Sequence, residues 1–351
     1  MSYKISLICL KSSSLLAFLL LLQPVFGQYN FAALDDLISK NQKLLGGDLI
    51  ALIYKDGKIV YKKELNKEFT VKTQAPVASC SKWLTAALVM TFVDEGKISL
   101  DDPVAKYIPI FASYSKKYIT IRNCLSHTTG IHAEEPGLKA ALQNRKFATL
   151  EDEVNAFAKR EIERNPGEMF FYSNIGLNIA ARVLEVVSKK TFDRLIAERL
   201  LRPLKMRNTT FYIDYDKAFN PSGGALSSAN DYINFLSMIL NKGMFESKRI
   251  LSEKAIAEMQ KKQTGTAVVK YAPAVAAGYD YGLGEWITEA GAGGNANAVS
   301  CPGLFGTFPI VDNCRGYACI IFVKTLLNEQ KKELYLSIKD AIDQQMTSTC
   351  K

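Results

Sequence analysis

Histidine is scarce in this chain of 351 residues, which contains only His127 and His132. No His-Glu-x-x-His segment and no clustered cysteine and histidine spacing occurs, so the sequence predicts no dedicated metal site. The glycine-rich stretch at 291–294 neither completes a dinucleotide-binding fingerprint nor precedes a Lys-Ser or Lys-Thr pair, and it is typical of a hairpin loop. We therefore expect the protein to work without a metal ion or a cofactor.

Dense runs of Lys and Arg interleaved with aromatic residues are also missing. The formal net charge is +9, which is a mild excess for a chain of this length. Such a charge without a basic run predicts an ordinary solvated surface and argues against a nucleic-acid partner. With 48% hydrophobic and 23% charged residues, the chain has enough apolar material for a substantial core.

Long hydrophobic runs are confined to the N-terminus. Residues 1–27 have the pattern of an export signal, in which two lysines precede an apolar core from Leu15 to Leu22 and Val25-Phe26-Gly27 offers the cleavage site. A retained membrane anchor is the alternative. No later segment is apolar and long enough to span a bilayer, so we expect a periplasmic or secreted protein whose mature chain begins near Gln28.

Few cysteines are available for disulfides. After removal of the signal, six remain: Cys80, Cys124, Cys301, Cys314, Cys319 and Cys350. An oxidising compartment allows disulfides, but a chain of this size does not require them, and spacing does not determine the pairing. Two alternatives stay open for Cys301, a disulfide with Cys80 or Cys314 and a free structural thiol.

Hydrophobic periodicity predicts strands near both ends of the chain and helices between them. Expected strands cover 48–54, 58–61, 281–286, 305–311 and 317–323, with Asp56-Gly57 as a hairpin turn. Expected helices cover 30–44, 79–95, 121–126, 150–160, 174–188, 192–200, 229–241 and 329–345. The pattern predicts an α/β (α+β) fold in which an antiparallel sheet built from both chain ends carries an inserted all-helical lobe. One domain would cover 28–351, with the sheet lobe at about 28–75 and 275–351 and the helical lobe at about 76–274.

Ser79-Cys80-Ser81-Lys82 places a hydroxyl and an amine one helical turn apart at the start of an apolar helix. Residues three apart share a helix face, so the Lys82 amine can accept the proton of the Ser79 hydroxyl. Backbone amides of the first helical turn favour negative charge where an oxyanion would form. This spacing indicates nucleophilic catalysis by serine.

Context distinguishes this segment from two others with the same spacing. Ser113 to Lys116 lies in a polar stretch, and Ser348 to Lys351 lies at the chain terminus, whereas Ser79 precedes a long apolar run. An alternative interpretation of Ser79 is a helix N-cap, with Lys82 in solvent.

A second candidate segment is Tyr172-Ser173-Asn174, which follows a turn and a short aromatic run. If these residues lie near Lys82, the phenol of Tyr172 can relay a proton between nucleophile and leaving group. The amide of Asn174 can orient Lys82 and bind a substrate amide.

Together these segments resemble the serine β-lactamase and penicillin-binding superfamily, in particular its class C branch with carboxypeptidase and esterase relatives. Similar stretches are 93–103, 121–131, 202–206, 223–228 and 281–284. The resemblance implies the β-lactamase/transpeptidase-like fold, Ser79 as the acylated nucleophile, Lys82 as base and Tyr172 as proton relay. No G-x-S-x-G segment is present to indicate a Ser-His-Asp triad, and the resemblance implies a structural loop at His127.

A third family element, Lys-Thr-Gly or His-x-Gly on an edge strand, matches Cys301-Pro302-Gly303 here. The resemblance implies that the amides of Ser79 and Leu304 form the oxyanion hole, which a change of side chain at 301 leaves intact. A thiol is mostly neutral at pH 7 and does not replace an ammonium group in binding a substrate carboxylate.

We therefore expect an exported serine hydrolase that forms an acyl-enzyme on an ester, amide or β-lactam bond. Its site would contain Ser79, Lys82 and Tyr172 as catalytic residues and Asn174, Cys301, Gly303 and Leu304 as substrate-binding residues. The substrate would be a small molecule or a peptide, with cell-wall fragments among the candidates. A catalytically weak binder or covalent penicillin sensor with the same fold is the alternative.

Overall fold

A computed structural model describes residues 29–134, 147–211, 218–324 and 332–350. The predicted export signal at 1–27 lies outside these described residues. Within them, no helix combines the length and the apolar character needed to cross a membrane.

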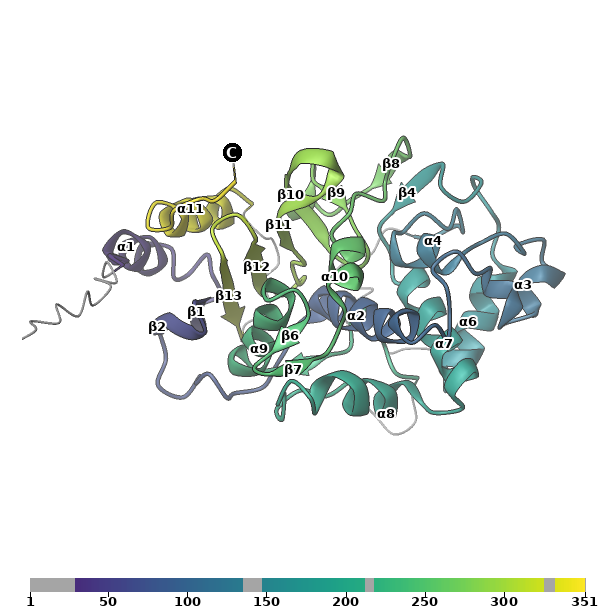
Figure 1. The fold of residues 1–351 in the computed structure, drawn as a ribbon, viewed down its shortest axis with the longest axis horizontal. Helices are drawn as coiled ribbons and strands as arrows, with labels where there is room; N and C mark the ends of the chain where they lie inside the picture. Colours follow the sequence, from purple (N-terminus) through teal and green to yellow (C-terminus); the bar gives the residue numbers. More distant parts are fainter. Residues whose placement is uncertain (1–28, 135–146, 212–217, 325–331, 351) are drawn as a thin grey trace, which may run out of the picture.

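The centre of the fold is a seven-stranded antiparallel sheet with the strand order β2-β1-β13-β12-β11-β10-β9 (Figure 1). Its strands are β1 Leu49–Lys55, β2 Lys58–Glu64, β9 Asp280–Tyr281, β10 Trp286–Ala290, β11 Ala296–Ser300, β12 Phe308–Asp312 and β13 Tyr317–Val323. Strands from the two ends of the chain thus meet where β1 pairs with β13. The predicted sheet built from both termini is confirmed.

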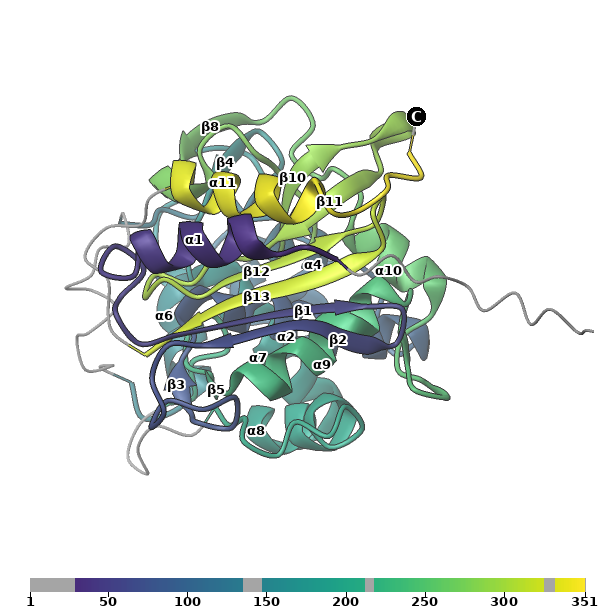
Figure 2. The same cartoon turned by 90° about the vertical axis from the view of Figure 1, so that its left-hand side faces the viewer.

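Both faces of the sheet are covered, which explains why β1 is apolar at successive positions. Leu49 and Ile53 pack on the face that carries α1 Ala32–Lys40 and α11 Lys332–Asp343, while Ile50 and Leu52 pack on the opposite face. Figure 2 shows α1 and α11 side by side over one face, with α9 Ala229–Leu240 across the other. The two-residue period of a strand therefore divides one apolar run between two cores.

A buried helix, α2 Ser81–Asp94, joins the sheet to the helical part of the molecule. All its residues from Ser81 to Phe92 are buried. A helix that is apolar on every side is stable only inside a protein. The other helices are α3 Ile110–Ser113, α4 Ile121–Leu125, α6 Leu150–Lys159, α7 Ile175–Ser188, α8 Phe192–Ile196 and α10 Glu253–Met259.

Short elements complete the chain. The short 3₁₀ helices are η1 Ala78–Cys80, η2 Val104–Lys106, η4 Ala274–Ala276 and η5 Ala292–Gly294, and η3 Ala197–Leu201 is one turn of π-helix. The strand pairs are β3 Ala75–Pro76 with β5 Leu226–Ser227, β4 Met169–Phe171 with β8 Val268–Tyr271, and β6 Met244–Phe245 with β7 Lys248–Arg249. The first and second of these pairs position the candidate site described below.

The prediction of a single strand over 281–286 is wrong. Two antiparallel strands, β9 and β10, pair there through Tyr281 and Trp286. Gly284 has φ +79° and packs so closely on α2 that an added Cβ would lie 2.4 Å from the Cβ of Ala86. A positive φ and this close approach require glycine, and they turn the chain where periodicity alone predicted extension.

Other boundaries differ in smaller ways. The strand predicted from 305 begins only at Phe308, because Gly306 has φ +101° and bends the chain. The first helix ends at Lys40 instead of 44. The strand β11, which leads into the segment at 301–304, was not predicted. The glycine-rich stretch at 291–294 lies in the hairpin between β10 and β11, as expected.

One disulfide, Cys314–Cys350, is present among the described residues, and Cys80, Cys124, Cys301 and Cys319 are free. Of the two alternatives for Cys301, the structure has the free thiol.

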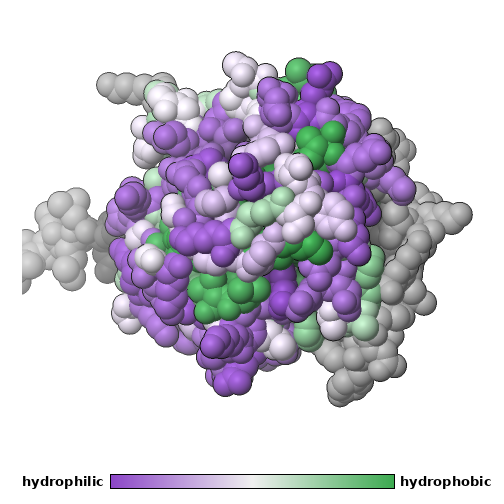
Figure 3. Space-filling view, turned by 90° about the vertical axis from the view of Figure 1, so that its right-hand side faces the viewer, coloured by the Kyte–Doolittle hydropathy of each residue, from purple (hydrophilic) through white to green (hydrophobic). Residues whose placement is uncertain are grey.

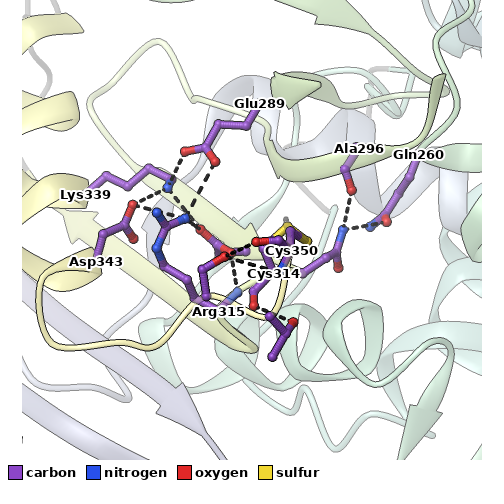
Figure 4. Close-up of a disulfide and its surroundings, with 12 residues drawn as sticks. Gln260, Glu289, Ala296, Cys314, Arg315, Lys339, Asp343 and Cys350 are labelled. Atoms are coloured by element: carbon purple, nitrogen blue, oxygen red, sulfur yellow. Dashed lines mark hydrogen bonds and ion pairs between the residues drawn. A yellow bond between two sulfur atoms is a disulfide. The ribbon is translucent and has the colours of Figure 1, made fainter. Parts of the chain in front are cut away.

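Beside the disulfide, Lys339 and Arg315 pair with the carboxylates of Glu289, Asp312 and Asp343 (Figure 4). These three carboxylates are close enough to hold a metal ion, but each of them already pairs with both Lys339 and Arg315.

The end of the molecule that carries the helices α3, α6 and α7 has a mainly hydrophilic surface. Figure 3 shows this face with hydrophobic residues in small, separate patches among hydrophilic ones. Scattered apolar residues of this kind are normal on a protein surface. The fold belongs to the predicted α/β (α+β) class, with an antiparallel sheet flanked by helices. The division into lobes at about 75 and 275 stays a prediction.

Candidate active site

Ser79 lies in a sharp turn at the entrance to α2. The chain arrives through β3, which pairs with β5, and the amide of Val77 donates to the carbonyl of Ala225 at 3.0 Å. Ala78 then has φ +45°, an unfavourable value for a residue with a Cβ. The hydroxyl of Ser81 secures the turn by donating to Ala78 O at 2.6 Å and accepting from Ala225 N at 3.0 Å. Ser79 is thereby held, half-buried, at the start of the central helix.

The amine of Lys82 lies at the centre of the site. Its Nζ lies 3.3 Å from Ser79 Oγ, 3.0 Å from Asn174 Oδ1 and 2.9 Å from the carbonyl oxygen of Ser222. Lys82 is only 1% exposed, and Ser79 is not the cap of α2, which begins at Ser81 without a side-chain cap. The alternative of an N-cap serine with a solvated lysine is therefore wrong.

Burial sets the protonation state of Lys82. Loss of solvation lowers the pKa of its amine from the ordinary value of 10.5 to about 8. Among the described residues no carboxylate pairs with it, and the nearby thiols of Cys301 and Cys80 offset only part of this shift. A substantial fraction of the amine is consequently neutral near pH 7 to 8, and a neutral amine can act as a base.

The contacts of Lys82 also orient the neutral amine. Such an amine has two N–H groups and one lone pair. The Ser222 carbonyl and the Asn174 Oδ1 can only accept hydrogen bonds, whereas the Ser79 hydroxyl can donate one. The two N–H groups therefore point to the two oxygen acceptors, and the lone pair points to the Ser79 hydroxyl.

Tyr172 reaches the site from the end of β4. Its amide donates to the carbonyl of Tyr271, the last residue of β8, at 3.1 Å. The centre of its ring lies 4.8 Å from Lys82 Nζ. Burial raises the pKa of the Tyr172 phenol well above its usual value, and the nearby Ser79 hydroxyl offsets only part of this rise. The phenol is therefore neutral at ordinary pH. It can donate or relay a proton, but it is not ionised beforehand to act as a general base.

His127 packs behind Tyr172. Their ring centres are 4.6 Å apart. His127 Nδ1 accepts from the amide of Ser173 at 3.4 Å, so the proton is assigned to Nε2, which lies 3.1 Å from the Tyr281 hydroxyl. Burial lowers the pKa of His127 well below its usual value, so its ring stays neutral. Both ring nitrogens are engaged away from Ser79, which fits the structural role implied by the resemblance.

The segment 301–304 lies against the entrance turn. The thiol of Cys301 donates to the carbonyl of Ser79 at 3.2 Å, and burial raises its pKa to about 12, so it is uncharged. A Cβ added to Gly303 would lie 2.3 Å from the carbonyl oxygen of Val77. Within the described residues, neither the amide of Ser79 nor that of Leu304 donates to another protein group. Both amides are thus available to a substrate oxygen.

The structure separates Ser79 from the second segment with the same spacing. Ser113 is exposed at the end of α3, and the amine of Lys116 donates to the carbonyl of Tyr114 at 3.2 Å. No hydrogen bond joins the side chains of Ser113 and Lys116 among the described residues. The third segment with this spacing, Ser348 to Lys351, cannot be compared in this way because Lys351 lies outside the described residues.

Two groups near the site were not predicted. The Ser222 carbonyl that accepts from Lys82 is a backbone atom, for which residue type carries no signal. Glu285 lies fully buried near the indole of Trp83, and burial raises the pKa of its carboxyl well above the usual range. It stays a neutral acid and adds no charge to the site.

Comparisons with known proteins identify a matching family and confirm the predicted β-lactamase/transpeptidase-like fold. The family model described as Beta-lactamase matches residues 34–341. The D-alanyl-D-alanine-carboxypeptidase/endopeptidase AmpH of Escherichia coli K12 is 26% identical over 191 residues, which cover 48% of this chain and 50% of AmpH. The chain spans between about a third and a half of the length of the curated relatives that it matches.

Solved structures match over nearly the whole chain. A β-lactamase candidate from Bacteroides dorei DSM 17855 superposes with a TM-score of 0.79 at 30% identity, covering 90% of this chain and 99% of that one. A family VIII carboxylesterase superposes with a TM-score of 0.72 at 18% identity, covering 90% and 97%. Because the identity is so low, the second match shows a similar fold and nothing more.

Proposed function

We propose, since this chain belongs to the Beta-lactamase family of serine hydrolases, that it hydrolyses its substrate through an acyl-enzyme formed on Ser79. The observation that carries the proposal is the buried amine of Lys82, which lies 3.3 Å from Ser79 Oγ and is held by the oxygen acceptors of Asn174 and Ser222. Each of the three groups comes from a different segment of the chain. Such an arrangement activates a serine without a histidine or a metal ion.

In the acylation step, Ser79 Oγ attacks the carbonyl carbon of the substrate while Lys82 takes the hydroxyl proton. The unpartnered amides of Ser79 and Leu304 stabilise the oxyanion that forms. The neutral phenol of Tyr172 donates a proton to the leaving group and recovers one from Lys82. Water then hydrolyses the acyl-enzyme. We assign no base to that second step.

The substrate class follows from Cys301. Family members with Lys or His at this place have a group that can bind a substrate carboxylate, whereas the Cys301 thiol is neutral and points to the Ser79 carbonyl. Loss of a charge-assisted hydrogen bond weakens recognition by about 1.5–3 kcal/mol. We therefore infer a preference for esters or amides without a carboxylate next to the reacting bond, ahead of penicillins and D-Ala-D-Ala peptides.

Export to the periplasm or beyond the cell is part of the proposal. It is supported by the signal-like pattern at 1–27 and by the disulfide between Cys314 and Cys350, because disulfides persist in oxidising compartments.

Asn174 is the proposed partner of a substrate carbonyl. Its Oδ1 accepts a hydrogen bond from Lys82, so its amide nitrogen is the atom that would donate to the substrate. Fragments of the cell wall are candidate substrates that an exported enzyme would meet.

A turnover panel tests these proposals with p-nitrophenyl acetate, a penicillin and a D-Ala-D-Ala peptide. We expect wild type to hydrolyse the ester fastest, Ser79→Ala to abolish hydrolysis, and Ser113→Ala, the control with the same local spacing, to leave it unchanged. Cys301→Lys should raise kcat/KM on the two carboxylated substrates about ten- to a hundredfold relative to the ester. Thermal unfolding of each variant verifies folding.

Three outcomes would replace the proposal. Ester hydrolysis in wild type that is no faster than the uncatalysed background would favour a non-catalytic binder, and turnover that persists in Ser79→Ala would mean that another group is the nucleophile. A penicillin adduct on Ser79 that persists for hours in a mass spectrum would instead indicate a covalent sensor that deacylates slowly. No gain in Cys301→Lys would refute the account of substrate class while leaving the nucleophile assigned.

A further inference from the structure

The peptide group between Pro221 and Ser222 is held at both of its polar atoms. The hydroxyl of Thr85 donates to the carbonyl oxygen of Pro221 at 2.6 Å. At the opposite edge of the same peptide group, the amide of Ser222 donates to Asn178 Oδ1 at 3.1 Å. With both atoms engaged, the plane of this peptide is fixed, and the direction of the next carbonyl, that of Ser222, depends on it.

The side chains that hold this peptide come from the same helices as the site itself. Thr85 lies one turn after Lys82 in α2, and Asn178 lies one turn after Asn174 in α7. Thr85 and Asn178 are both buried, at 0% and 1% exposure. Each helix therefore contributes one group that contacts the reacting centre and one that holds the loop behind it.

The amide of Asn178 has a defined orientation. Its Nδ2 donates to the carboxylate of Glu153 in α6 at 2.8 Å, which leaves Oδ1 to face the amide of Ser222. The hydroxyl of Ser222 also donates to Asn220 Oδ1 at 2.8 Å. The loop is thus anchored by side chains from two helices, one of them oriented by Glu153 of a third helix, and by its own residue Asn220.

The Ser222 carbonyl in turn decides where the lone pair of Lys82 points. If this carbonyl moves, one N–H of the neutral amine loses its acceptor, and the amine can rotate until the N–H faces Ser79. A lone pair directed away from the hydroxyl cannot take its proton. Small misplacements of a reacting group of this kind reduce rates by about ten- to a hundredfold.

We propose that Thr85 and Asn178 are positioning residues that hold the Ser222 carbonyl and thereby direct the amine of Lys82 at the Ser79 hydroxyl. The inference rests on the proposed function, because it assigns a role within the same acylation step. Neither residue touches the substrate. Both act through the 221–222 peptide.

A substrate-independent test measures the rate at which a fluorophosphonate labels Ser79. In this reaction Ser79 Oγ bonds to phosphorus, the phosphorus–fluorine bond breaks, fluoride leaves, and Lys82 takes the hydroxyl proton. We expect Thr85→Val, which keeps the shape but loses the hydroxyl, to slow labelling about ten- to a hundredfold. Thr85→Ser, which keeps the hydroxyl, should restore most of the rate. On the preferred ester, Thr85→Val should lower kcat with little change in KM.

Two further variants complete the test. Asn178→Leu removes the other anchor and should slow labelling to a similar extent, which gives an independent result if Thr85→Val folds poorly. Thr91→Val is the control, because Thr91 is another buried hydroxyl of α2 that donates to Leu88 O at 2.7 Å, away from the site. It should lower thermal stability but leave labelling unchanged.

Several results would overturn the inference. One is labelling of Ser79 at the wild-type rate in both Thr85→Val and Asn178→Leu. Another is a labelling rate in Thr85→Ser that stays as low as in Thr85→Val. A third is an equal fall of the labelling rate in Thr91→Val, which would mean that general destabilisation causes the effect. Failure of the proposed function has a different signature, namely no labelling of Ser79 in wild type itself. That result would refute both the proposed function and the inference that rests on it.

Discussion

Lys82 is an amine kept in an apolar interior without an anionic partner among the described residues. Most buried lysines are paired, because removing an ammonium group from water is costly. Here the cost is reduced by a lower pKa and by two oxygen acceptors, Asn174 Oδ1 and Ser222 O. The chemistry proposed for Ser79 depends on this one desolvated side chain.

The pH dependence of acylation tests the role of Lys82. Only the neutral amine accepts the Ser79 proton, so kcat/KM should rise with pH and reach half its maximum near pH 8, the pKa to which burial lowers Lys82. Initial rates of p-nitrophenyl acetate hydrolysis between pH 5.5 and 9.5 measure it, with the Ser79→Ala rate subtracted at each pH as the non-enzymatic background.

Competing groups predict different profiles. Burial holds the pKa of His127 well below 6.5 and that of Tyr172 well above 10, so neither titrates near pH 8. A half-maximal rate near pH 6, or a rate without pH dependence over this range, would contradict the assignment of Lys82 as the base.

Among the elements, the end of β11 and the entrance turn of α2 must pack together for the site to exist. The two segments lie 222 residues apart in sequence, and the Cys301 thiol bridges them at the Ser79 carbonyl. Gly303 permits their close approach, since any side chain there would meet the backbone of Val77. The proposed oxyanion hole needs both the turn and the strand end, since each contributes one of its two amides.

Gly303→Ala should therefore impair acylation more than stability. An added Cβ would lie 2.3 Å from Val77 O and 3.1 Å from Cys80 Sγ, so the strand end must move and carry the Leu304 amide away from that of Ser79. Loss of one oxyanion donor lowers kcat by about a hundred- to a thousandfold. Steady-state hydrolysis of p-nitrophenyl acetate, beside a thermal unfolding curve, measures both effects.

Gly291→Ala is the matched control for this variant. Gly291 lies in the hairpin at the other end of β11, and an added Cβ there would meet chiefly the side chain of Asn297, which can rotate away. Its kcat should stay within about twofold of wild type, because the oxyanion donors are untouched. Equal losses in the two variants would show that the close approach at Gly303 has no specific role.

At the scale of the whole molecule, the C-terminal end is tied back onto the sheet. The disulfide from Cys350 reaches Cys314 in the turn between β12 and β13, and Thr349 hydrogen-bonds to the carbonyl of Cys314. Figure 4 shows the neighbouring ion pairs of Lys339 and Arg315, which join α11 to the same strands. This anchor lies at the opposite end of β12 from the segment at 301–304.

Removing the disulfide should lower stability but not activity. The bond closes a loop with a sequence separation of 36, and its loss from a Cys314→Ala, Cys350→Ala variant should cost about 2–4 kcal/mol of unfolding free energy. Calorimetry of wild type and variant gives the shift in Tm, and ester hydrolysis at 25 °C should be unchanged.

A reductant provides the matched comparison. It should lower the Tm of wild type to that of the variant and leave the variant itself unaffected, because the four other cysteines of the described residues are free. A Tm that does not respond to the reductant would mean that the two thiols are not paired in the folded protein.

The sequence by itself determined the local elements and which residues are candidates for the reaction. A short apolar run followed by Asp56-Gly57 predicts the first hairpin, and the apolar run after Ser79 predicts a buried helix. These features are local, because neighbouring side chains set the period of a strand or a helix and the type of a turn. The motif segments also sufficed to predict the family, which is confirmed.

Only the tertiary structure decided the environment of those groups. Spacing predicts that Ser79 and Lys82 share a helix face, but not that Lys82 is buried, that Ser222 offers its carbonyl 140 residues later, or that the Cys301 thiol stays free. Desolvation and hydrogen-bond partners come from segments far apart in sequence. They exist only once the sheet and the helices have packed, so no local pattern encodes them.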